Sequence, residues 1–185
     1  DKAPSPVMAG ATARAIFTGT RYPASLLEAT MLRIRAEREI TPGRAAILKA
    51  YYLKNSHEQC PKEVLTVSLN ENSTNIPYTL GRLFAVYEEV QERANPGINA
   101  TIRDKYFNSA SATPAVIFPI LDNLSMKHLR KLDTGSRIVK ENQIGKLKNV
   151  LGESYPTRLS LPEQGSFNLG YYHQKQFRYT KKEEK

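Results

Sequence analysis

Apolar residues recur every three or four positions along most of the chain, which is the spacing of amphipathic α-helices. Leu27, Met31 and Ile34 form one such stripe. No alternation of strands and helices and no internal repeat period interrupts the pattern. The pattern predicts an all-α protein, a bundle of about seven or eight helices, with helices expected over residues 25–38, 41–56, 78–94, 100–107, 114–132, 136–153 and 159–185.

Start signals support several of these helices. Thr41 precedes Pro42, and Thr113 precedes Pro114, so each pair offers an N-cap followed by a residue that lacks the N–H left unpaired in a first turn. Asn99 is the expected cap of the short helix over 100–107. The next helix contains Pro119, which we expect to bend it, and the following helix has Gly152 near its end. Ser160 and Glu163 have the spacing of a capping box.

The helix over 78–94 has the clearest amphipathic pattern. Leu80, Leu83, Phe84, Tyr87 and Val90 share one face, which we expect to pack on the core. The pattern places the charged residues on the opposite, solvent-facing side, and these are Glu88, Glu89, Glu92 and Arg93.

Residues 56–77 are polar and contain many turn-forming residues, so this stretch indicates a long loop or a linker. Only the run EVLTVSL at 63–69 alternates as a short strand would. The sequence therefore predicts a basic N-terminal helical segment over 1–62 and a helical bundle with a short charged tail over 63–185. These two parts form either packed subdomains or one continuous domain.

The 185-residue chain is long enough for a buried core and has a formal net charge of +9. The basic excess lies toward the two ends of the chain, which favours a polyanionic partner, nucleic acid before membrane; a solvated basic surface is the alternative. Cys60 is the single cysteine, and no apolar run approaches membrane-spanning length. We expect a cytoplasmic protein that makes no membrane contact.

No catalytic constellation is evident. His57 and Cys60 are three residues apart in a polar stretch, without the surroundings of a nucleophile or a metal ligand set. His128 lies on the apolar side of its helix and is expected to be a satisfied core residue, whereas His173 is ambiguous. We therefore expect no enzyme activity, no metal and no cofactor.

Basic residues gather in clusters, some of them beside aromatic residues that are able to stack on bases. Tyr171, Tyr172, Phe177 and Tyr179 accompany the last cluster, and we expect them to be shared between core and surface. A cationic last helical turn also satisfies the helix dipole, so the cluster that begins at Lys127 has an ordinary structural explanation as well. The candidate nucleic-acid-binding residues are Arg33, Arg35, Arg38, Arg44, Arg103, Lys105, Lys127, Arg130, Lys131, Lys175 and Arg178.

The stretch RDKYFNSASATPAVIF, residues 103–118, contains a run of small residues from Ser109 to Ala112. One interpretation is a tight connection between two helices. The other is a surface that a phosphate chain approaches, with the helix N-terminus at Thr113 as the anion seat and with Arg103 and Lys105 beside it.

Several long strings resemble one known family. YTLGRLFAVYEEVQERA, INATIRDKYFNSASATPAVIFPIL and LSLPEQGSFNLGYYHQKQ, in this order, are similar to the C-terminal region of the large subunit of the type I-C CRISPR Cascade complex. The earlier strings ARAIFTGTRYPASLLEATMLRIRAER and GRAAILKAYY resemble the preceding segment of the same family. The resemblance spans nearly the whole chain.

The resemblance implies a non-catalytic helical part of an RNA-guided antiviral surveillance complex, whose C-terminal region acts as, or is also made separately as, a small subunit. It implies contact with the other Cascade subunits, the guide RNA–target DNA duplex and the displaced DNA strand. A scaffold that bridges backbone subunits or recruits the helicase-nuclease is the alternative. Because the chain begins with Asp1, we expect a fragment or a processed product, with Met8 and Met31 as candidate internal starts.

Overall fold

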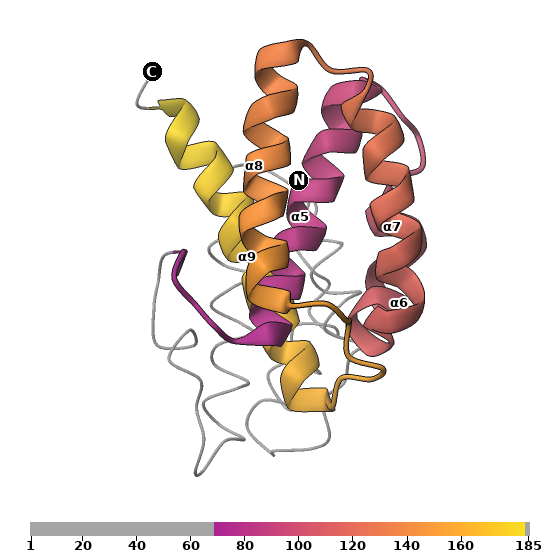
Figure 1. Ribbon diagram of the computed structural model, residues 1–185, viewed down its shortest axis with the longest axis vertical. Coiled ribbons are helices and arrows are strands. Elements are labelled where there is room, and N and C mark those ends of the chain that lie inside the picture. The colour runs from indigo at the N-terminus through magenta and orange to yellow at the C-terminus, as the bar shows by residue number, and fades with distance from the viewer. Residues whose placement is uncertain (1–68, 184–185) are drawn as a thin grey trace, which may run out of the picture.

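The computed structural model describes residues 69–183, with side chains up to residue 178. This part of the chain contains five helices and no strand (Figure 1): α5 (Ile76–Ala94), α6 (Ile102–Ala112), α7 (Pro114–Leu129), α8 (Thr134–Leu151) and α9 (Leu161–Glu183). The all-helical prediction is confirmed for these residues. They do not support the expected total of seven or eight helices. The helices expected over 25–38 and 41–56, and the run at 63–69 with strand-like alternation apart from Leu69, lie outside the described residues.

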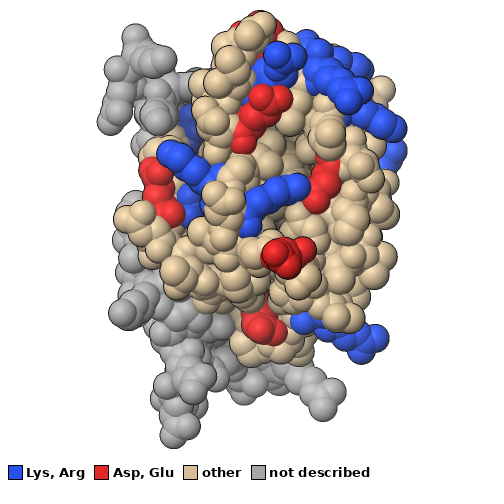
Figure 2. All heavy atoms as spheres, viewed as in Figure 1, with Lys and Arg blue, Asp and Glu red and all other residues tan. Residues whose placement is uncertain are grey.

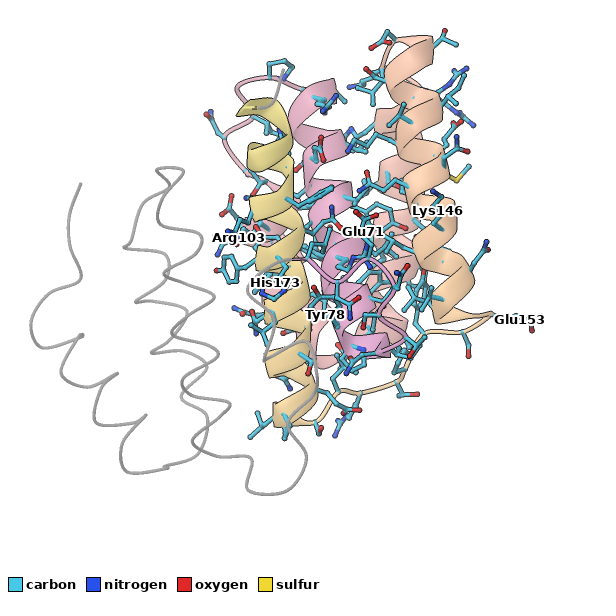
Figure 3. The ribbon with its side chains drawn as sticks, turned by 90° about the vertical axis from the view of Figure 1, so that its left-hand side faces the viewer. Glu71, Tyr78, Arg103, Lys146, Glu153 and His173 are labelled. Carbon is cyan, nitrogen blue, oxygen red and sulfur yellow. The ribbon has the colours of Figure 1, made fainter. Side chains whose placement is uncertain are left out.

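Helix α5 runs through the middle of the bundle. In Figure 3 it lies between α9 on one side and α8 on the other, in Figure 1 α6 and α7 lie beside it, and it contacts all four. It begins at a cap in which Asn75 Oδ1 accepts from the Tyr78 N–H at 3.0 Å, with Pro77 in the first turn. Every residue from Tyr78 to Gln91 is buried. A helix surrounded in this way has no solvent-facing side along most of its length.

The predicted exposure of the charged face of α5 is wrong for Glu88 and Glu89, whereas Glu92 is half-buried and Arg93 is exposed as predicted. Glu88 and Glu89 retain only 3% and 5% of their accessible surface. The reason is tertiary, because α8 and α9 cover this face and bring positive side chains to it. The hydrophobic pattern of one helix identifies its apolar face but does not show whether other helices pack on its polar face.

Aromatic rings fill the core between α5, α6 and α9. Phe107 makes edge-to-face contacts with Tyr171 and Phe167, at centroid separations of 4.8 Å and 5.6 Å, and Phe84 contacts all three of these rings. Tyr171 and Tyr172 are buried, at 0% and 1% exposure. Neither ring is available to stack on a base, which corrects the expectation for these two residues; Phe177 is half-buried, and the side chain of Tyr179 lies outside the described part of the chain.

The small-residue run belongs to α6 rather than to a loop. The helix continues to Ala112, and Thr113 is at once the C-cap of α6 and the N-cap of α7. Ala110 and Ser111 are buried, so the absence of bulk lets neighbouring parts of the bundle approach this turn. The cap of α6 is Thr101, in a capping box with Asp104, and not Asn99 as expected.

The predicted helix end at Gly152 and the predicted pairing of Ser160 with Glu163 are confirmed. Pro119 lies inside α7 without ending it, and Gly152, with a φ of +79°, ends α8. Ser160 donates to Glu163 from both its backbone N–H and its hydroxyl, each at 2.6 Å, at the start of α9. Among the described residues no helix is both long and apolar enough to cross a lipid bilayer.

Candidate nucleic-acid interface

Three predicted site residues form one exposed cluster where α7 ends. Lys127 lies in the last turn of α7, Arg130 is its C-cap and Lys131 follows, and all three are exposed. Figure 2 shows Lys and Arg side chains gathered at the corner of the molecule where α7 leads into α8. Helix carbonyls at this end carry partial negative charge, which stabilises the cations. We call Lys127, Arg130 and Lys131 the α7 basic cluster.

The α7 basic cluster is tied to the end of α5 by a chain of two hydrogen bonds. Lys131 Nζ donates to Asn95 Oδ1 at 2.8 Å, and Asn95 Nδ2 lies 3.0 Å from His128 Nδ1. Asn95 is also the C-cap of α5. His128 is half-buried, in keeping with its expected place on the apolar side of α7, and burial together with the charge of Lys131 lowers its pKa.

Two other predicted residues, Lys175 and Arg178 on α9, face the carboxylates of α5 instead. Lys175 Nζ lies 3.1 Å from Glu88 Oε2, which also accepts from the Tyr171 hydroxyl at 2.7 Å. Arg178 pairs with Glu92 at 2.5 Å and approaches Glu89 at 3.6 Å. Because these two cations already neutralise carboxylates of α5, they attract a phosphate only weakly.

Lys140 of α8 completes this network and was not predicted. Its Nζ lies 2.6 Å from Glu89 Oε2, and both side chains are buried. Burial alone would raise the pKa of Glu89, but Lys140, Arg178 and Arg93 hold that pKa below its ordinary value. The sequence gives no signal of this burial, because the partner Glu89 lies 51 positions away along the chain.

Asp122 makes a second junction between elements. It accepts from the hydroxyls of Tyr87 on α5 and Tyr155, which follows α8, and it pairs with Lys148 at 2.9 Å. Burial and the Asp122 carboxylate raise the pKa of both tyrosines well above the usual range. The junction holds α7 against α5 and α8.

Arg103 and Lys105 lie in the first two turns of α6. Arg103 is half-buried, with its guanidinium 5.3 Å from the centroid of Phe107 and its Nη2 3.3 Å from the Tyr172 hydroxyl. Lys105 is exposed. Arg103 thus packs on the aromatic core, and Lys105 is the more accessible of the two.

The proposed anion seat at Thr113 is wrong. The Thr113 N–H donates to Ser109 O at 2.8 Å, the Ala115 N–H to Pro156 O at 3.0 Å and the Val116 N–H to Thr113 O at 3.1 Å. The segment before α9 thus occupies this helix start. Arg103 is ten residues away, about 15 Å along the helix axis, so it does not flank the seat.

The other residues considered in the sequence are either buried or outside the described part of the chain. His173 is buried, with Nδ1 2.9 Å from the Tyr78 hydroxyl (Figure 3). Within residues 69–178, no group of three or more His, Cys, Asp or Glu side chains has an arrangement that would hold a metal ion. His57 and Cys60, together with the predicted binding residues Arg33, Arg35, Arg38 and Arg44, lie outside the described residues.

Fold and site together define a helical bundle with a cluster of exposed cations at one end. The family model described as CRISPR-associated protein (Cas_Csd1) matches residues 1–179. The chain therefore belongs to the Csd1 family of CRISPR-associated proteins. No curated protein matches the chain.

Proposed function

We propose that this chain is the C-terminal, small-subunit-like region of the type I-C Cascade large subunit, and that it contacts nucleic acid without catalysing a reaction. Family membership supports a role in a CRISPR complex. In guided effectors, base pairing reads the sequence while the protein recognises shape and backbone. A basic bundle matches the second of these tasks.

The α7 basic cluster is the observation that carries this proposal. Lys127 and Arg130 are exposed, and neither forms an ion pair with a carboxylate in the described part of the chain. Lys175 and Arg178, by contrast, are committed to Glu88, Glu89 and Glu92. Uncompensated cations release counterions from a phosphate backbone, so the cluster fits the guide–target duplex or the displaced strand.

A charge-matched pair of variants tests the proposal. K127A/R130A removes one Lys and one Arg from the α7 basic cluster, and K146A/R158A removes the same charges elsewhere. Lys146 and Arg158 are exposed, and Lys146 lies on α8 away from α9 (Figure 3). In the assembled complex we expect K127A/R130A to weaken target-DNA binding and to reduce the salt slope by about 2, one for each phosphate that the variant no longer neutralises.

Equal DNA affinities and equal salt slopes for the two double variants would exclude the α7 basic cluster as the contact. The measurement is the dissociation constant for target DNA at a series of salt concentrations. Circular dichroism of each purified chain confirms that the variants keep their helices.

A scaffold is the second candidate, and exposed apolar residues favour it. Val116 on α7 and Val139 on α8 are 61% and 63% exposed, and Ile138 and Met126 are about half exposed. Glu88 and Glu89 on α5 are buried, so they do not form a surface that a neighbouring subunit could meet. If the scaffold role holds, I138S/V139S prevents association with the other Cascade subunits or the helicase-nuclease while the chain stays folded.

A further inference from the structure

Hydrogen-bond chemistry determines the protonation state of His128. A lysine ammonium only donates, so the Asn95 atom that faces Lys131 at 2.8 Å must be the amide oxygen. The amide NH2 therefore faces His128 Nδ1, at 3.0 Å. Because an NH2 group donates, Nδ1 must accept, and the ring is neutral with its proton on Nε2.

Protonation of His128 is incompatible with this arrangement. A proton on Nδ1 would set two donors against each other, and the amide relieves that conflict by turning its oxygen toward the ring. The same rotation turns the NH2 toward the Lys131 ammonium, and the tether on Lys131 is lost. Protonation thus places a positive charge on His128, and it also frees Lys131, two residues beyond the end of α7, from its hydrogen bond.

The groups around His128 allow such titration. The charged group that acts on the ring is Lys131, and its contact from α5 is the uncharged Asn95. In the described part of α5, α6 and α8, no carboxylate pairs with the ring. A phosphate that binds next to the ring would favour the charged form, against the effects of burial and of Lys131.

We infer that Asn95 and His128 are positioning residues for Lys131: neutral His128, through Asn95, holds Lys131 back from phosphate, and protonated His128 releases it. This inference rests on the proposed function, because it assumes that the α7 basic cluster binds a nucleic-acid backbone. The ligand class is a phosphodiester chain. Binding to it is therefore linked to proton uptake at one histidine.

The test measures binding of a single-stranded oligothymidylate to the full chain between about pH 8 and about pH 5.5, across the ordinary histidine pKa, at constant ionic strength. As the pH falls, the wild-type affinity should rise about tenfold for each unit by which bound phosphate raises the pKa of His128. H128Q, which keeps polar groups but does not titrate, should lose this rise. N95A should bind more tightly than wild type at the alkaline end, because Lys131 is already free.

The control for N95A is the same substitution on a K131A background, where the alkaline gain should vanish. An H128Q profile parallel to that of wild type would overturn the inference, and so would an N95A affinity equal to wild type at the alkaline end.

Nitrogen NMR of the His128 ring separates failure of the inference from failure of the proposed function, because it needs neither variant nor DNA. A neutral ring protonated on Nε2 supports the tether, whereas a proton on Nδ1 overturns it. If the ring has the expected tautomer but K127A/R130A leaves the oligothymidylate affinity unchanged, the proposed function fails, and the inferred effect on phosphate binding fails with it.

Discussion

Gly81 of α5 and Gly170 of α9 lie where the two helix backbones touch. A Cβ at Gly81 would lie 1.9 Å from the carbonyl oxygen of Phe167, and one at Gly170 would lie 2.0 Å from that of Tyr78. The obstructing atoms are backbone, so no side-chain rotation relieves either clash. The contact between α5 and α9 is the most extensive one between two helices in the described part of the bundle, and it therefore requires glycine at both positions.

Gly81→Ala should lower the free energy of unfolding by about 1–3 kcal/mol, because the added methyl group forces α5 and α9 apart. Gly145→Ala is the matched control in α8, where a Cβ meets open space. This control should raise stability by roughly 0.5–1 kcal/mol through helix propensity. Urea unfolding followed by circular dichroism measures both, and equal stabilities would contradict the close approach of the two backbones.

Lys140→Met should destabilise the bundle by about 3 kcal/mol, because it leaves Glu89 buried with one fewer partner. The value lies at the lower end of the usual range, since Arg93 still pairs with Glu89 at 2.7 Å. Arg137→Ala is the control, as its pair with Glu141 is exposed at 3.8 Å and contributes about 0.5 kcal/mol or less. Similar effects of the two substitutions would show that Lys140 is not buried against Glu89.

Glu89 should make stability depend on pH in the acid range. Its pKa in the folded protein is below the ordinary value of 4.5, so the folded state favours the ionised form. The stabilisation is complete above the unfolded-state pKa and disappears as the pH falls through the lower folded-state pKa. We expect the stability difference between wild type and E89Q to be constant near neutral pH and to shrink at acid pH. A difference that grows on acidification would mean that the pKa is raised.

Lys175→Ala and Lys127→Ala should affect different properties. Removing Lys175 leaves Glu88, which is 3% exposed, with the Tyr171 hydroxyl as its described partner, and should cost about 1 kcal/mol or more of stability. Its effect on DNA affinity should be small. Lys127 is exposed, so its removal should change stability by less than about 0.5 kcal/mol while weakening DNA binding. Thermal unfolding and DNA titration of both variants measure the two properties, and a reversed result would favour α9 as the nucleic-acid contact.

Local signals predicted the helices of the described region well. Pro114, Gly152, and Ser160 with Glu163 act within one or two turns, so their effect is contained in neighbouring residues. The α7 basic cluster was predictable for the same reason, since its three cations lie within five positions of one helix end. Asn95 was missed, because its contact with Lys131 joins residues 36 positions apart.

The sequence by itself determined that this chain forms helices, where most of those in the described region begin and end, and which residues form the apolar face of α5. These properties follow from backbone hydrogen bonding and from spacing along one helix. Only the tertiary structure decided that Glu88 and Glu89 of α5 are buried too, that Lys175 and Arg178 neutralise them, and that the Pro156 carbonyl accepts a hydrogen bond at the supposed phosphate seat. Those outcomes depend on residues that are distant in sequence. A buried charge is stable only when the fold places an opposite charge beside it.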